Sequence, residues 1–303
     1  MISIATIREV RKVTESWKRQ GLTVGFVPTM GYLHEGHASL IQKARSENNK
    51  VVVSIFVNPI QFSPNEDFER YPRNFERDRE ICERAGADLI FAPSVVEMFP
   101  SKNLAFADVS ELGEYLCGAK RPGHFRGVCT IITKFFNIIR PDRAYFGEKD
   151  FQQLAIIQRM AKDLSCDTQI VPCPTIRDTD GLALSSRNSY LSDTERRAAR
   201  VVPDSLNLAR KAVADGEKDA AAIKNIISEK IAAEPLAKID YIEVVDVSLL
   251  KPITQIDRPA IVAVAIFIGT TRLIDHFSLR KVSNDFKHVE IKDTPGCGYR
   301  GQS

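Results

Sequence analysis

Residues 22–47 have the pattern of a buried strand, a glycine-containing turn and the start of a helix, and this pattern most narrows the folds open to the chain. The apolar run Leu22 to Val27 is typical of a buried strand. The turn from Thr29 to His37 contains two glycines, and Ala38 to Glu47 repeats apolar residues at helical spacing. Such a unit is typical of a parallel α/β sheet. The free N–H groups at its helix N-terminus attract anions, phosphate above all.

The turn carries two histidines, His34 and His37, three residues apart. Side chains at this spacing share a face on the first helical turn. Both imidazoles could therefore donate hydrogen bonds to oxygens whose charge grows in a transition state. Gly31 and Gly36 would let the backbone approach such a ligand closely. Taken alone, the pair also fits two solvated histidines, so this interpretation needs support from the rest of the chain.

A second near-continuous apolar run, Lys50 to Val57, predicts a strand covered on both faces. It ends at Asn58 and Pro59, which stop a strand and turn the chain. Ligands bind at the carboxyl ends of strands in open α/β sheets. Gln61 would then lie beside the histidine turn, with a donor and an acceptor for a small polar substrate. An ordinary loop amide is the alternative.

Two later stretches carry groups suited to phosphate. A short predicted strand at 143–146 leads into a second glycine turn and helix start, where Lys149 supplies a point charge. The polar loop at 175–190 places two serine hydroxyls beside Arg187, whose planar guanidinium suits a polyphosphate. Taken alone, Lys149 and Arg187 could each also be an ordinary exposed side chain.

A glycine-rich basic loop at 121–127 opens another predicted helix. Within it, Arg121 and His124 are candidates for an additional anion contact. A solvated loop is the alternative interpretation.

The remaining periodicity predicts the other elements of the fold. Helices are expected at 4–18, 74–85, 109–116, 128–139, 151–164, 193–214 and 219–233, and strands at 89–92, 167–171, 239–247, 260–268 and 272–279. Pro203 predicts a kink or break in its helix. We expect an α/β fold, with a Rossmann-like parallel sheet covered by helices on both faces and a smaller α+β C-terminal domain.

We place the domain boundary within 175–190, where the character of the sequence changes. This gives a ligand-binding catalytic domain at 1–180 and a smaller lid domain at 181–303 that begins with the Ser-Ser-Arg loop. The polar tail from Asn284 is expected to be loosely held.

Composition excludes several classes of function. The net charge of +3 over 303 residues is too small to indicate nucleic-acid binding, and the basic residues are scattered. The longest apolar run, 260–268, is about half a membrane span. The N-terminus lacks the pattern of a signal peptide. The six cysteines form no C-x-x-C pair or zinc-like spacing, so we expect reduced thiols in a cytoplasmic protein.

Four sequence motifs, taken together, then indicate a family. They are Pro28-Thr29-Met30-Gly31-x-Leu33-His34-Glu35-Gly36-His37, Phe56-Val57-Asn58-Pro59-x-Gln61-Phe62, Gly147-Glu148-Lys149-Asp150-Phe151-Gln152-Gln153 and Leu184-Ser185-Ser186-Arg187-Asn188. In this order and spacing they closely resemble the pantothenate synthetase (pantoate–β-alanine ligase) family, a branch of the HxGH nucleotidyltransferases.

The resemblance implies a Rossmann-like domain with a smaller domain over the site, usually as a homodimer. It also implies two half-reactions. Pantoate carboxylate attacks the α-phosphorus of Mg-ATP to give pantoyl adenylate and pyrophosphate, and the β-alanine amine then displaces AMP to give pantothenate. ATP and Mg²⁺ enter as substrate, the metal ligands stay unknown, and no prosthetic group or membrane partner is expected.

Family roles carry over to the matching positions. The catalytic group is His37, His34, Lys149 and Arg187, with His37 as the proton donor. The ATP-binding group is Met30, Gly31, Tyr32, Leu33, His34, Glu35, Gly36, His37, Gly147, Glu148, Lys149, Asp150, Ile176, Leu184, Ser185, Ser186 and Arg187. Gln61 and Gln153 would bind pantoate, and Gln61 would also meet β-alanine. The family normally has Met at the position of Leu184, where backbone groups can still serve adenine.

Two other functions stay open from the sequence. Another HxGH transferase would join ATP to a phosphate acceptor, which would need basic residues where this chain has glutamines. A non-catalytic nucleotide sensor could keep the fold, although the intact histidine, lysine and arginine positions argue against it.

Overall fold

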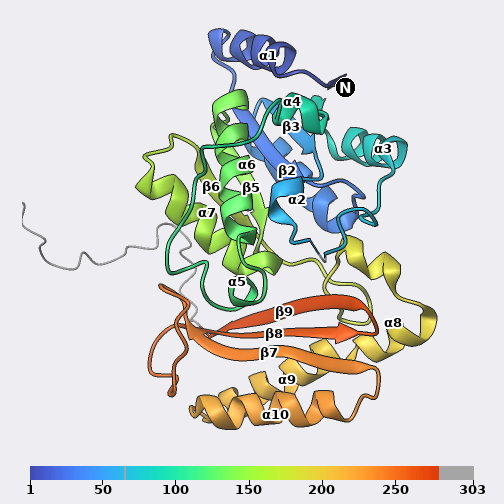
Figure 1. Ribbon diagram of the computed structural model, residues 1–303, viewed down its shortest axis with the longest axis vertical. Helices are drawn as coiled ribbons and strands as arrows, with labels where there is room; N and C mark the ends of the chain where they lie inside the picture. Colours follow the sequence, from blue (N-terminus) through green and yellow to red (C-terminus); the bar gives the residue numbers. More distant parts are fainter. Residues whose placement is uncertain (65, 280–303) are drawn as a thin grey trace, which may run out of the picture.

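The computed structural model describes residues 1–64 and 66–279 (Figure 1). Its larger sheet has six parallel strands in the order β1-β4-β3-β2-β5-β6. The strands are β1 Ile2–Ile4, β2 Val24–Thr29, β3 Lys50–Ile55, β4 Leu89–Phe91, β5 Arg143–Gly147 and β6 Gln169–Cys173. The chain runs outward from β2 through β3 to β4 and later returns on the other side of β2 as β5. The switch point, where ligands bind in such sheets, therefore lies between β2 and β5.

Helices cover both faces of this sheet, as expected. They are α1 Ile7–Arg19, α2 Glu35–Glu47, α3 Phe75–Ala85, α4 Val95–Met98, α5 Cys117–Lys120, α6 His124–Ile139 and α7 Phe151–Asp163. Successive strand residues point to opposite faces. Phe26 packs on one face with the buried residues of α1, α6 and α7. Its neighbour Val27 packs on the other face with those of α2 and α3.

A smaller unit lies at the C-terminal end of the chain (Figure 1). Three antiparallel strands, β7 Ala237–Asp246, β8 Ala260–Ile268 and β9 Thr271–Leu279, pack with α8 Asp193–Ala199, α9 Val201–Ala214 and α10 Ala220–Ala232. Strand β8 is buried on both faces: Val262 faces the helices of this unit, while Ile261 joins the core of the larger sheet. This explains why 260–268 is apolar throughout.

The helix predicted at 109–116 is wrong. This stretch forms turns, and a short helix, α5, begins only at Cys117. Glu111 and Leu116 adopt left-handed backbone angles, with φ of 65° and 50°. The buried Gln152 amide donates to the carbonyls of Leu112 and Tyr115 and accepts from the Cys117 N–H. Hydrogen bonds from another element thus replace those of a helix.

Two other predicted helices differ from the structure in where they begin or break. The first predicted helix, 4–18, begins later, because Ile2–Ile4 pairs with β4 as a strand and Thr6 caps α1 by accepting from the Glu9 N–H. The break in the helix 193–214 falls at Arg200, three residues before Pro203. Pro203 then sits in the first turn of α9, where an N–H would have no helical partner.

The helix predicted at 128–139 begins earlier, at His124, so part of the predicted loop 121–127 is helical. Most other boundaries agree closely with expectation. Helix α3 ends at Ala85 because Gly86 adopts the left-handed conformation of a C-cap, with φ of 93°. The predicted tail from Asn284 lies outside the described residues. In the described part of the chain, no helix is both long and apolar enough to cross a bilayer.

Candidate active site at the switch point

The histidine turn connects β2 to α2, with His34 as the N-cap of the helix. The Gly36 N–H donates to Nδ1 of His34 at 3.1 Å, and the His34 N–H donates to Nδ1 of His37 at 3.3 Å. The two ring centroids are 4.1 Å apart. Because each Nδ1 accepts a backbone hydrogen bond, the neutral ring carries its proton on Nε2. The fold thus assigns each imidazole one remaining donor.

Both imidazoles are held in the neutral form. Burial lowers the pKa of His34 to about 4, and the nearby Lys149 charge adds to this effect. Burial also lowers the pKa of His37 well below its usual range, with a further contribution from His34. Asp150 opposes both shifts without reversing them. At neutral pH the pair therefore acts as two uncharged hydrogen-bond donors.

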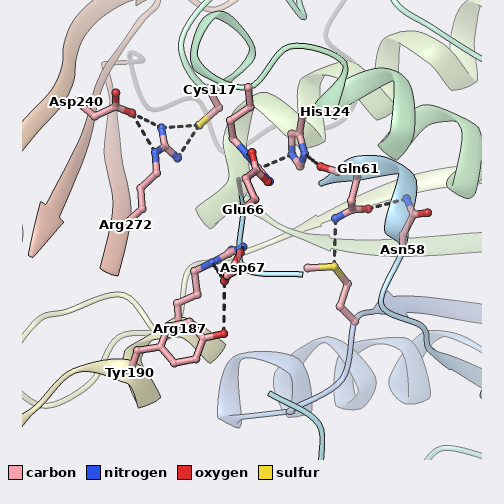
Figure 2. Close-up of polar contacts among 12 residues, drawn as sticks. Asn58, Gln61, Glu66, Asp67, Cys117, His124, Arg187, Tyr190, Asp240 and Arg272 are labelled. Carbon is pink, nitrogen blue, oxygen red and sulfur yellow. Dashed lines mark hydrogen bonds and ion pairs between the residues drawn. The ribbon is translucent and has the colours of Figure 1, made fainter. Parts of the chain in front are cut away.

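Two buried amides follow β3. Asn58 donates from Nδ2 to Oε1 of Gln61 at 2.9 Å, and Gln61 donates to the Met30 sulfur at 3.1 Å (Figure 2). Asn58 Oδ1 has no hydrogen-bond partner among the described residues, although Asn58 is only 1 % exposed. Such a buried acceptor is costly unless a ligand satisfies it. Asn58 itself lines the smaller of the two cavities described below.

Helix α6 comes unusually close to these amides. A Cβ on Gly127 would overlap the Ile60 carbonyl oxygen, so only glycine permits this approach. His124, on the first turn of α6, lies with Nδ1 2.8 Å from the Gln61 carbonyl oxygen, and its Nε2 faces Arg121 at 3.0 Å. Because the guanidinium can only donate, the imidazole Nδ1–H donates to Gln61. His124 thereby fixes the backbone of Gln61.

Lys149 and Asp150 follow β5, on the other side of the switch point. Lys149 Nζ lies 3.3 Å from Asp150 Oδ1. Burial raises the pKa of Asp150, but the Lys149 charge and hydrogen bond outweigh it and leave the carboxyl pKa below its usual value. This end of the sheet therefore carries a charged pair directly opposite the histidine turn.

The serine–arginine loop reaches the same place from the start of the smaller unit. Ser186 donates from its hydroxyl to the Tyr32 carbonyl at 3.1 Å. Arg187 makes a two-pronged ion pair with Asp67, at 2.9 Å and 2.8 Å, and Tyr190 also donates to this carboxylate (Figure 2). Burial opposes the charge of Arg187, yet the Asp67 carboxylate keeps its pKa above the ordinary value.

Most of these groups line a cavity of about 230 Å³. The predicted residues that line it are Met30, His34, Gly36, His37, Gln61, Gly147, Lys149, Asp150, Gln153, Ile176, Leu184, Ser185, Ser186 and Arg187. A larger cavity of about 780 Å³ lies between the two units and shares several of these residues, including Gln61 and Lys149. Together they form a continuous cleft at the carboxyl edge of the sheet.

Five residues of the predicted nucleotide site line neither cavity: Gly31, Tyr32, Leu33, Glu35 and Glu148. Leu33 is fully buried in the core under α2, and Glu35 is exposed. For Leu33, any contact with a nucleotide would have to come from the backbone, and the role of all five residues stays a prediction.

Arg121 lines only the larger cavity, where its guanidinium pairs with Glu66 at 2.8 Å and 2.5 Å. Its predicted anion contact also stays a prediction.

Sequence reasoning did not select several polar residues that line the two cavities, among them Asn58 and Tyr71. Asn58 belongs to a quoted block, so its position beside Gln61 was a usable signal. His124 is predicted as an anion contact in a basic loop, whereas in the structure it begins α6 and hydrogen-bonds to the Gln61 carbonyl, so its anion contact stays a prediction. Tyr71 is 6 % exposed and lines the smaller cavity, but it comes from a polar, irregular stretch that carries no periodic signal.

The described histidines predict a pH dependence of stability. Burial is the largest cause that lowers the pKa of His34, His124 and His276 to about 4, and it also lowers that of His37. The unfolded chain, with histidine pKa values near about 6.5, binds more protons below that pH. The free energy of unfolding should therefore be largest above about pH 6.5 and fall as the pH drops toward 4. Urea denaturation followed by circular dichroism at several pH values checks this. Constant stability from pH 7 to 5 would contradict it.

Fold and cleft together define a class: a doubly wound α/β protein with a ligand cleft at its switch point, built from a helix N-terminus, imidazole donors and fixed cations. The comparisons then identify the family. The model of the family described as pantoate-beta-alanine ligase matches residues 2–278. A pantothenate synthetase of Clostridium acetobutylicum is 56% identical over 273 residues, covering 90% of this chain and 97% of that protein. One from Caldicellulosiruptor saccharolyticus is 50% identical over 276 residues, covering 91% and 98%.

Solved structures agree. A pantothenate synthetase from Thermus thermophilus superposes with a TM-score of 0.86 at 43% identity, covering 91% of this chain and 99% of that one. A pantoate-beta-alanine ligase from Francisella tularensis, described as complexed with beta-gamma ATP and beta-alanine, gives 0.75 at 36%, covering 91% and 97%. The chain belongs to the pantoate–β-alanine ligase family and is an enzyme.

Proposed function

We propose that this enzyme activates pantoate with ATP as pantoyl adenylate, releasing pyrophosphate, and then transfers the pantoyl group to β-alanine with release of AMP. The observation that carries the proposal is the cleft itself. Two imidazole donors, Lys149 and Arg187 surround one end, and Gln61 and Gln153 flank the same space. The Francisella relative, described with an ATP analogue and β-alanine, supports this choice of ligands.

Adenylation makes chemical sense of a cleft whose groups are mostly hydrogen-bond donors and cations. A carboxylate is a poor electrophile because oxide is a poor leaving group, whereas AMP is a good one. The protein then needs to position the reactants and stabilise charge, which is what a preorganised set of donors can do.

We assign the triphosphate to the end of the cleft where α2 begins. The Nε2–H groups of His34 and His37, with the helix N-terminus, face the α-phosphate, and His37 donates the hydrogen bond that strengthens in the transition state. Lys149, Arg187 and the hydroxyls of Ser185 and Ser186 take the β- and γ-phosphates. Asp150 and Asp67, the present ionic partners of the two cations, mark where anionic oxygens would bind.

Adenosine would lie against Gly147 to Asp150, Ile176 and Leu184, and all of these except Glu148 line the smaller cavity. Leu184 keeps an apolar surface for adenine.

Mg²⁺ enters as part of the Mg-ATP substrate. Among the described residues no group of three His, Cys, Asp or Glu side chains could hold a metal ion. Mg²⁺ typically keeps several waters and binds phosphates with one or two carboxylates. Asp150 is a carboxylate in the cleft that fits this role, so the residues present suit an ion carried mainly by the triphosphate.

Pantoate is assigned to the amide end of the cleft. Gln61 and Gln153 offer donors and acceptors for its hydroxyls and carboxylate, and the unpartnered Asn58 Oδ1 offers an acceptor for a hydroxyl. Gln61 would also contact β-alanine, and the β-alanine carboxylate would bind Arg121, which lines the larger cavity together with Gln61.

Replacing Gln61 by Ala should raise the KM for pantoate about tenfold or more and leave the KM for ATP within about twofold, because one bidentate amide is lost on the pantoate side only. Pantoate-dependent release of pyrophosphate measures both constants. Equal changes in the two KM values would count against the assignment.

The same assay distinguishes the alternatives. A nucleotide adenylyltransferase would release pyrophosphate with a phosphate acceptor and not with pantoate, and a sensor would show no turnover. We also retain as proposals the division into 1–180 and 181–303, a homodimer and a cytoplasmic location; sedimentation equilibrium tests the dimer.

A further inference from the structure

The turn that presents the two histidines has an unusual backbone. Gly31 and Tyr32 are consecutive residues with positive φ, at 84° and 52°. For a residue with a side chain such as Tyr32, this conformation is unfavourable and persists only where the surroundings enforce it. Something outside the turn must therefore hold it.

Asp78 supplies that constraint from α3, more than forty residues further along the chain. Its carboxylate accepts from the Tyr32 N–H at 2.8 Å and from the Leu33 N–H at 2.6 Å, one bond to each oxygen. Asp78 is only 1 % exposed, and none of the ion pairs among the described residues includes it. Successive N–H groups in a tight turn form a concave anion site, and here the chain fills that site with its own carboxylate.

The held turn leads directly to the imidazoles. The N–H next along the backbone belongs to His34, and it donates to Nδ1 of His37. A shift of the Tyr32–Leu33 peptide groups would move this N–H and release the ring of His37. The Tyr32 carbonyl is held from the other side by the Ser186 hydroxyl of the serine–arginine loop.

We propose that Asp78 is a positioning residue for the reaction: by binding the N–H groups of Tyr32 and Leu33, it sets the backbone that aims the Nε2–H donors of His34 and His37 into the cleft. It touches no substrate and lines neither cavity. The inference rests on the proposed role of the two histidines.

The natural test is Asp78→Asn, which keeps the size of the side chain. One of the two acceptor oxygens becomes an NH₂ donor, so one of the two backbone N–H groups loses its acceptor. A matched control exists in Asp246, 8 % exposed, which likewise accepts from backbone N–H groups, those of Ser248, Leu249 and Lys251. Asp246 also lines neither cavity. Asp246→Asn should cost stability in the same way but leave the cleft unchanged.

At a temperature where both variants are folded, D78N should lower kcat for pantoate-dependent pyrophosphate release at least tenfold, with little change in the KM for pantoate, while D246N keeps kcat. In parallel, histidine titration by NMR without substrates should show the pKa values of His34 and His37 rising in D78N toward about 6.5. A smaller loss of kcat, a loss that D246N shares, or an unchanged titration would overturn the proposal.

Should D78N fail to fold, Asp78→Ser, which retains one acceptor at shorter reach, is judged by the same two measurements. The titration separates this proposal from the proposed function. If the unchanged protein released no pyrophosphate with pantoate, the proposed function would fail, whereas the histidine shift in D78N would still stand or fall by itself.

Discussion

Replacing His37 by Ala should lower the rate of adenylation about 100-fold to 1,000-fold, or about 3 kcal/mol or more, while the fold is kept. Its Nε2–H is one of two uncharged donors fixed in the cleft, and loss of one preorganised donor has this size of effect. The measurement is single-turnover release of pyrophosphate from ATP and pantoate without β-alanine. Thermal unfolding checks that the protein is intact.

His37→Gln is the matched variant, since its amide nitrogen reaches near the position of Nε2 and can donate there. We expect it to recover part of the rate that His37→Ala loses. An alanine variant with a nearly normal adenylation rate would remove His37 from the chemistry.

Replacing Lys149 by Met should lower the adenylation rate about 100-fold or more, because the fixed cation that we assign to the departing pyrophosphate is lost. Its control is Lys50→Met. Lys50 begins β3, at the opposite edge of the sheet, and pairs with Asp88 at 3.2 Å much as Lys149 pairs with Asp150 at 3.3 Å. Single-turnover release of pyrophosphate should distinguish the Lys149→Met and Lys50→Met variants.

We expect Lys50→Met to have a rate within about twofold of the unchanged protein, since Lys50 lines neither cavity. Similar rates for the two variants would mean that Lys149 serves only the fold. Lys149→Arg should recover little, because the planar guanidinium does not replace a compact ammonium.

Long apolar patterns made most of the fold predictable. The strands at 22–27 and 50–57, the helix ending at Gly86 and the apolar β8 all lie within a few residues of their predicted positions. The predictions failed where tertiary contacts decide the local structure. The strand Ile2–Ile4 exists only through its pairing with β4, and the stretch 109–116 is held in turns by the side chain of Gln152.

The site divides in the same way. The family resemblance supplied the residues that line the cleft, such as His37 and Lys149, because they lie in blocks with fixed spacing. It could not supply Asp78, because its role follows from contacts across 45 and 46 positions in the chain. Nor could it show that the backbone assigns the protons of both imidazoles, which depends on the angles of the turn.

The central claim is that one cleft converts the carboxylate of pantoate into an adenylate, and oxygen labelling tests this most directly. Pantoate with ¹⁸O in its carboxylate is incubated with ATP, β-alanine and the enzyme, and the products are examined by mass spectrometry. The account predicts one labelled oxygen in AMP, with unlabelled pyrophosphate. Label in inorganic phosphate together with formation of ADP would contradict it, because the acid would then have been activated at the γ-phosphorus.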